Sequence, residues 1–202
     1  MPRRIEAVLF DLLMAVMDSP AVWALAAGDA ERGMAWRDAV TARMVRSGRY
    51  RPYEELVASE ARALHLPPSS VDRLWSAWRV MDPRPDADAI GRLALPYAFV
   101  TNCSTILAAE AARRSGLDPS FVLSAEEAGV FKPSPGIYLM ACSGIRSAPE
   151  RTLFVAGAAY DAAGARAAGL SAALVVRRPL RDALDGRIER LRGLDEVHRV
   201  IR

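Results

Sequence analysis

The chain has 202 residues, of which 51% are hydrophobic and 25% charged, and this composition excludes a disordered or fibrous protein. The 27 basic residues are nearly balanced by 24 acidic ones, so the net charge of +3 does not point to a nucleic-acid partner. Its two cysteines, Cys103 and Cys142, lack the spacing of metal ligands or of a disulfide framework. We therefore expect one closed core with no metal and no cofactor.

No stretch of the sequence reaches the roughly 20 consecutive apolar residues that a membrane-spanning helix needs. The apolar run that follows the first charged residues is interrupted by Asp11, so it does not fit a signal peptide. We expect a cytoplasmic protein with no membrane partner.

Five short apolar runs are typical of strands that are buried on both faces of a sheet. They span residues 7–10, 97–100, 121–123, 153–155 and 174–176. Alanine-rich segments with helical spacing lie between them, at 106–114 and 162–168. This alternation predicts an α/β fold with a doubly wound parallel sheet.

One long interval, from residue 19 to residue 85, contains no convincing strand but several stretches of helical periodicity. They span residues 21–27, 34–45, 53–64 and 71–80, separated by proline-rich segments. The simplest interpretation is a helical cap, residues 19–87, inserted after the first strand. Residues 1–18 and 88–202 are then expected to form the α/β core.

Polar residues follow four of the predicted strands. Asp11 follows the first strand, Thr101 and Asn102 the second, Lys132 comes after the third, and Asp161 follows the fourth. In open parallel sheets, functional groups collect at the carboxyl ends of the strands. We therefore expect these side chains to converge at one edge of the sheet.

The spacing of these residues resembles the four motifs of the haloacid dehalogenase-like superfamily. The matching segments are Phe10-Asp11, Val100-Thr101-Asn102, Phe131-Lys132-Pro133, and the run from Phe154-Val155 to Asp161. The pair Trp36-Arg37 and the string Tyr160-Asp161-Ala162-Ala163-Gly164-Ala165-Arg166 are similar to motifs of the L-2-haloacid dehalogenase branch. The resemblance covers nearly the whole chain, including the expected cap.

This resemblance implies nucleophilic catalysis on a small-molecule substrate. Asp11 would attack the substrate carbon, displace a leaving group and form an aspartyl ester that water opens. Lys132 would keep Asp11 ionised and oriented, because a nearby positive charge favours a carboxylate. Asp161 would orient Lys132 or the hydrolytic water, and Arg37 would receive the departing halide.

The remaining expected site residues would contact the substrate. Thr101 and Asn102 would bind its carboxylate or stabilise developing charge. Leu13, Trp36 and Tyr160 are expected to complete the binding surface. Because similar dehalogenases pair through their caps, the resemblance also implies a homodimer.

The sequence departs from the family pattern at several polar positions. Asp11 is followed by Leu12-Leu13-Met14-Ala15, where dehalogenases have x-Tyr-Gly-Thr and phosphatases x-Asp-Gly-Thr. Ala156 and Ala158 stand where Ser and Asn are expected. Mg²⁺ prefers several oxygen ligands, usually including carboxylates, so these replacements favour a metal-independent hydrolase.

Alternative interpretations stay open at this point. The chain could be a catalytically degenerate binding protein, or an enzyme that uses Asp11 as a general acid or base on an apolar substrate. Asp161 could cap a helix that begins near Ala162, while Thr101 and Asn102 could shape a turn. Cys103 and Trp23 are interpreted as packing residues.

Overall fold

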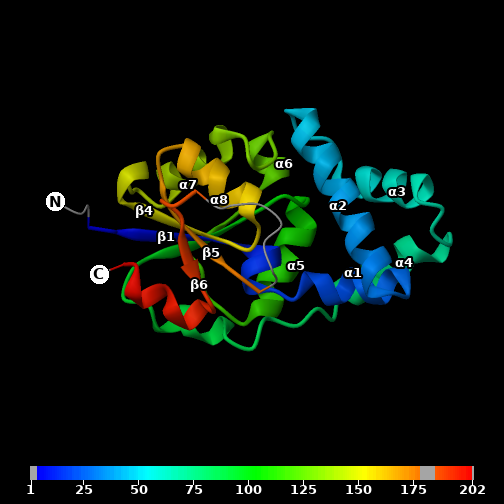
Figure 1. The fold of residues 1–202 in the computed structure, drawn as a ribbon, viewed down its shortest axis with the longest axis horizontal. Helices are drawn as coiled ribbons and strands as arrows, with labels where there is room; N and C mark the ends of the chain where they lie inside the picture. The colour runs from blue at the N-terminus through cyan, green and yellow to red at the C-terminus, as the bar shows by residue number, and fades with distance from the viewer. Residues whose placement is uncertain (1–3, 178–184, 202) are drawn as a thin grey trace.

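The computed structural model describes residues 4–177 and 185–201. Six parallel strands form one sheet in the order β3-β2-β1-β4-β5-β6 (Figure 1). The strands are β1 (Ala7–Asp11), β2 (Tyr97–Thr101), β3 (Val122–Ser124), β4 (Thr152–Ala156), β5 (Ser171–Val175) and β6 (Glu189–Leu191). The predicted α/β fold with a parallel sheet is confirmed.

Helices cover the sheet and connect its strands. The core helices are α5 (Thr105–Ser115), α6 (Ala125–Ala128), α7 (Pro135–Gly144) and α8 (Ala159–Ala167), with 3₁₀ turns η2 (Ala87–Arg92), η3 (Pro149–Arg151) and η4 (Leu194–Arg199). α7 and α8 pack together on one face of the sheet (Figure 1). α5 lies on the other face. The connection from β2 to β3 and the connection from β4 to β5 lead away from β1 in opposite directions, and right-handed crossovers then place their helices on opposite faces of the sheet.

Two strands differ from the sequence-based expectation. β5 was expected at residues 174–176, but the strand begins at Ser171, because its first residues are small and carry little β-strand signal. β6 was not predicted at all: two of its three residues, Glu189 and Arg190, are exposed and charged. Among the strands of the described residues it pairs only with β5, so a polar composition is compatible with its position at the sheet edge.

The strand register brings the polar residues to one edge. Asp11 lies beside Val100 of β2, and Phe10 lies beside Val155 of β4. The carboxyl ends of these three neighbouring strands therefore coincide. The side chains that follow them are placed within reach of one another, as the sequence predicts.

A helical insert, defined as Ser19–Trp78, lies between β1 and β2 in sequence. It consists of α1 (Ser19–Ala27), α2 (Ala30–Ser47), α3 (Tyr53–Ala63) and α4 (Ser69–Trp78), and follows the π-helical turn η1 (Leu12–Val16). Figure 1 shows it beside the sheet, with α1 packed against α2 and α4. Gly33 permits the close contact of α1 and α2, because a Cβ there would lie 2.5 Å from the carbonyl oxygen of Trp23.

The boundaries of a separate cap domain at residues 19–87 stay a prediction. Within the described ranges 4–177 and 185–201, every helix is too short or too polar to cross a membrane.

Candidate active site

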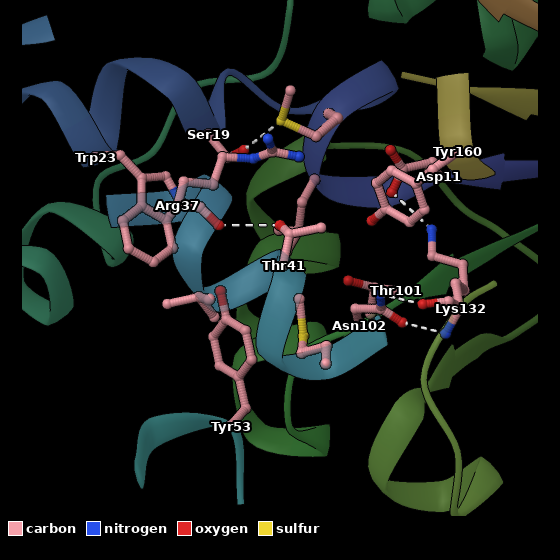
Figure 2. A pocket seen from close by; sticks show the side chains of 14 residues that line it. Asp11, Ser19, Trp23, Arg37, Thr41, Tyr53, Thr101, Asn102, Lys132 and Tyr160 are labelled. Carbon is pink, nitrogen blue, oxygen red and sulfur yellow. Dashed lines mark hydrogen bonds and ion pairs between the residues drawn. The ribbon is translucent and has the colours of Figure 1, made fainter. Parts of the chain in front are cut away.

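Lys132 lies at the centre of a buried charge cluster. Its Nζ donates to Asp11 Oδ1 at 2.9 Å and to Asp161 Oδ2 at 2.6 Å, and to the carbonyl oxygen of Val100 at 3.2 Å. Figure 2 shows the contact between Lys132 and Asp11. A lysine ammonium has three N–H donors, and all three are engaged here. Lys132 therefore fixes both carboxylates and has no donor left for a ligand.

Burial and charge act in opposite directions on this cluster. Burial tends to lower the pKa of Lys132, but the carboxylates of Asp11 and Asp161 outweigh it and raise that pKa above its usual value. Burial raises the pKa of Asp161 to about 6, with Asp11 adding to the increase and Lys132 opposing it. The lysine therefore remains a cation at neutral pH, and Asp161 titrates just below neutrality.

Tyr138 completes the cluster, although the sequence interpretation did not include it. Its hydroxyl donates to Asp161 Oδ1 at 2.5 Å, and its ring packs edge-on against Phe154. Burial and the nearby carboxylate raise the pKa of Tyr138 well above its usual value, so it stays a neutral donor. The sequence signal was its position one helical turn after the Lys132 loop, on the apolar side of α7.

Asp161 itself is the third residue of α8. The helix begins at Ala159 with Ala158 as its N-cap, so the suggested cap of a helix at Ala162 is corrected. Asp161 is 1% exposed and does not line the pocket described below. It contacts Lys132 and Tyr138 from behind the cavity wall.

Replacing Tyr138 with phenylalanine should raise the pKa of Asp161 further, because the lost hydrogen bond favours the charged form. We expect the titration midpoint, followed by the NMR shift of the Asp161 carboxyl carbon, to move from about 6 toward neutral pH. Because the pKa of Asp161 is higher in the folded protein than the ordinary aspartate value of about 3.9, the group contributes stability below about pH 4 that is lost as the pH rises through 6. An unchanged midpoint in Y138F would contradict this role.

Asn102 fastens the loop that carries Lys132. Its Oδ1 accepts from the Lys132 backbone N–H at 2.7 Å, and its Nδ2 donates to the Lys132 carbonyl at 3.1 Å (Figure 2). The end of β2 thus holds the backbone of Lys132 through Asn102 and its ammonium through Val100.

The neighbouring Thr101 hydroxyl lies 3.4 Å from the Sγ of Cys103. Cys103 is fully buried, and burial raises the pKa of its thiol to about 12, as suits a packing residue.

A pocket lies between this cluster and the helical insert (Figure 2). Residues from both parts of the chain line it: Asp11, Leu13, Met14, Ser19, Trp23, Arg37, Val40, Thr41, Met44, Tyr53, Thr101, Asn102, Lys132 and Tyr160. Its cavity volume is about 40 Å³. One water needs about 10–15 Å³, so the pocket in this conformation fits only a small ligand.

Most of the sequence-predicted site residues come together here. Arg37 reaches the pocket from α2, and Leu13 and Tyr160 also line it. Burial of the Tyr160 side chain and the nearby Asp161 carboxylate raise the pKa of Tyr160 to about 12, so the Tyr160 hydroxyl is neutral near pH 7.

Trp36 was expected to contact the substrate, but the structure places it elsewhere. Its side chain is fully buried within the helical insert, and its indole N–H donates to the carbonyl oxygen of Val57 at 2.9 Å. Its ring packs edge-on against Trp23, with centroids 4.9 Å apart. Trp23, which the sequence assigned to packing alone, therefore forms the pocket wall, and Trp36 supports it from behind.

Gly157 lets the turn after Asp11 approach the end of β4. A Cβ at this position would lie 2.4 Å from the backbone carbon of Met14 and 2.6 Å from the backbone nitrogen of Ala15. Contacts this short with backbone atoms cannot be relieved by a side-chain rotation. Because η1 carries two pocket residues, Leu13 and Met14, the position of the pocket floor depends on Gly157.

We expect G157A to lower the free energy of unfolding by about 1–3 kcal/mol, the usual range for overpacking a dense core. Urea denaturation measures this change. G136A is the matched control, because a Cβ there would meet only an ordinary contact, 3.7 Å from Val130. Equal midpoints for the two variants would contradict the close approach.

The donor set does not fit a magnesium ion. No group of three or more His, Cys, Asp or Glu side chains that could hold a metal occurs in the part of the chain that the structure describes. The Lys132 ammonium lies between the two site carboxylates, and the side chains of Leu13 and Ala158 offer no oxygen ligand. Mg²⁺ requires near-octahedral oxygen ligation, which these side chains do not supply.

Fold and site together define an α/β protein with a buried aspartate–lysine centre beneath inserted helices. The family model for haloacid dehalogenase-like hydrolases matches residues 18–169, and the chain belongs to this family.

Three known proteins are similar to the chain in sequence or in fold. The curated (S)-2-haloacid dehalogenase 2 from Pseudomonas sp. (strain CBS-3) is 33% identical over 108 residues, which are 52% of this chain and 47% of that protein. The chain spans about half the length of the curated relatives that it matches. A solved dehalogenase with intermediate complex has a TM-score of 0.87 at 22% identity, covering 100% of this chain and 99% of the other. The L-2-haloacid dehalogenase from Xanthobacter autotrophicus with chloropropionic acid covalently bound has a TM-score of 0.81 at 23% identity, covering 98% of both chains.

Proposed function

We propose that this protein is a metal-independent hydrolase of the 2-haloacid dehalogenase type, with Asp11 as the nucleophile on a small carboxylate. One observation carries the proposal. Asp11 Oδ1 is held by Lys132, whereas Oδ2 has no hydrogen bond to a described residue, and Asp11 lines the pocket. A carboxylate with one oxygen fixed and the other free is oriented for attack.

In the first step, Asp11 Oδ2 attacks C2 of the acid. The carbon–halogen bond breaks, the halide leaves with the bonding electron pair, and an aspartyl ester forms. The Arg37 guanidinium lines the pocket on the insert side, where it is placed to bind an anionic group. The bound chloropropionic acid of the Xanthobacter autotrophicus dehalogenase supports this choice of substrate.

In the second step, water attacks Cγ of Asp11 in the ester. Negative charge then develops on Oδ1, which lies 2.9 Å from the Lys132 ammonium. A fixed cation at the atom where charge develops stabilises the tetrahedral intermediate. Cleavage of the Cγ–Oδ2 bond releases the 2-hydroxy acid and a proton to solvent, and regenerates Asp11.

We further propose that the helical insert acts as a cap over the site, with residues 1–18 and 88–202 as its core. Residues of α1, α2 and α3 line the pocket opposite the sheet edge, which supports this division.

Intact-protein mass spectrometry tests the reaction directly. After incubation with each enantiomer of 2-chloropropionate and rapid acid quenching, the protein mass should increase by the substrate without its halogen. Peptide mapping should place the increase on Asp11. Halide release with no adduct at any quench time would contradict the ester, and absence of both would contradict the dehalogenase activity.

A binding protein without hydrolysis is the second candidate. It is favoured by Ala15 and Ala156, which are fully buried beside the site and carry no side-chain hydrogen-bonding group to position water. Removal of one oriented donor costs about 2.7–4 kcal/mol of barrier in other enzymes. Saturable binding of 2-chloropropionate without halide release would select this candidate.

A further inference from the structure

The lysine and asparagine donors at the sheet edge of the pocket are bonded within the protein. All three donors of Lys132 are engaged, and both the oxygen and the nitrogen of the Asn102 side chain are bonded to the Lys132 backbone. The Arg37 guanidinium makes one hydrogen bond to a described residue, to Asp38 at 3.0 Å. Since arginine carries five N–H donors, Arg37 retains capacity for an anion.

Ser19 is a second donor on the same side of the pocket. It is the first residue of α1 and is 1% exposed, and its hydroxyl donates to the Sδ of Met14 at 3.3 Å. A thioether sulfur is a weak acceptor, so an anion at this position would replace it readily. The positive end of the nine-residue α1 dipole adds to this preference. Figure 2 shows Ser19 and Arg37 together on one side of the pocket, with Asp11 and Lys132 on the other.

We propose that Ser19 is a further anion-binding residue beside Arg37, and that its hydroxyl leaves Met14 to donate to the anion that Arg37 binds. This inference deepens the proposed function and rests on it for the source of the anion. The anion is either the carboxylate of the substrate or the departing halide. Both offer the same chemistry to a hydroxyl and a guanidinium.

Anion binding can be measured without turnover. Sodium bromide and sodium propionate are titrated separately at constant ionic strength, and the fluorescence of Trp23 is followed because this residue lines the pocket. W23F should lose the response, which verifies that the signal comes from the pocket. Saturation by bromide alone assigns the subsite to the leaving group, and saturation by propionate alone assigns it to the carboxylate. Saturation by neither overturns the proposal.

Two substitutions should change the affinity for the anion in opposite directions. S19A should weaken binding about 10-fold, because one charge-assisted hydrogen bond is lost. M14L should strengthen it several-fold, since it frees the hydroxyl at nearly constant volume; a purely structural role of Ser19 predicts no such gain. S19T should retain binding, and S76A is the matched control on an exposed serine of α4. An affinity of S19A within two-fold of the wild type overturns the proposal.

This experiment separates the subsite from the reaction. A protein that binds either anion but forms no ester on Asp11 would retain the subsite and exclude the dehalogenase activity. Ester formation on Asp11 together with an unchanged anion affinity of S19A would support the dehalogenase activity and contradict the role of Ser19.

Discussion

Replacement of Asp11 by asparagine is expected to reduce halide release from 2-chloropropionate by at least about 1,000-fold, because the variant lacks the nucleophilic oxygen. The asparagine side chain has the same shape, and its carbonyl oxygen can still accept from Lys132 Nζ. The fold should therefore persist, and the loss should appear in kcat. Ion chromatography of released chloride measures the effect.

The Asp11→Asn variant also predicts a change at a second residue. Asp11 contributes to the raised pKa of Asp161, so D11N should lower that pKa from about 6 toward its ordinary value. The control is D88N, which alters an exposed aspartate paired with Arg92. Undiminished chloride release in D11N would exclude Asp11 as the nucleophile.

Replacement of Lys132 by methionine is expected to lower the free energy of unfolding by about 3–5 kcal/mol, the usual cost of removing one partner from a buried ion pair. The variant leaves Asp11 and Asp161 buried without their shared cation. Chloride release should be lost as well, since neither the orientation of Asp11 nor the charge at Oδ1 is maintained. Urea denaturation gives the stability change, with R92M in an exposed ion pair as the control.

The stability of K132M should depend on pH in a defined direction. Lys132 lowers the pKa of Asp161, so its removal raises that pKa beyond about 6. The folded variant then binds protons more readily than the unfolded chain, and its stability should fall as the pH rises from 5 to 8. A variant that is equally stable at both ends of this range would show that Asp161 no longer titrates within the folded cluster.

The central strands could be predicted from the sequence because the physical signal is strong there. The β1 segment is a run of apolar residues buried on both faces, and Asp11 closes it at the carboxyl end. β6 could not be predicted, because two of its three residues are charged and only its pairing with β5 makes it a strand. The start of β5 at Ser171 was missed for a similar reason, since neighbouring strands determine it.

The charged centre of the site was also predictable, whereas the pocket wall was not. Asp11 ends β1 and Lys132 follows β3 after the short helix α6, so the parallel topology brings both to one edge of the sheet. Which indole of the helical insert faces the cavity depends on the rotation of α1 against α2. From the sequence, Trp36 was expected at the site and Trp23 in the packing, whereas the structure places Trp23 at the pocket and Trp36 behind it.

The position of β1 in the sheet has a consequence for synthesis and folding. The first strand of the chain is flanked by β2 and β4, which begin at Tyr97 and Thr152. A growing polypeptide therefore carries the apolar residues 7–10 unpaired until β2 has left the ribosome, and with one open edge until β4 follows, and such segments promote aggregation. Expression yield should depend on chaperones during translation, and C-terminal truncations that remove β4 should be insoluble.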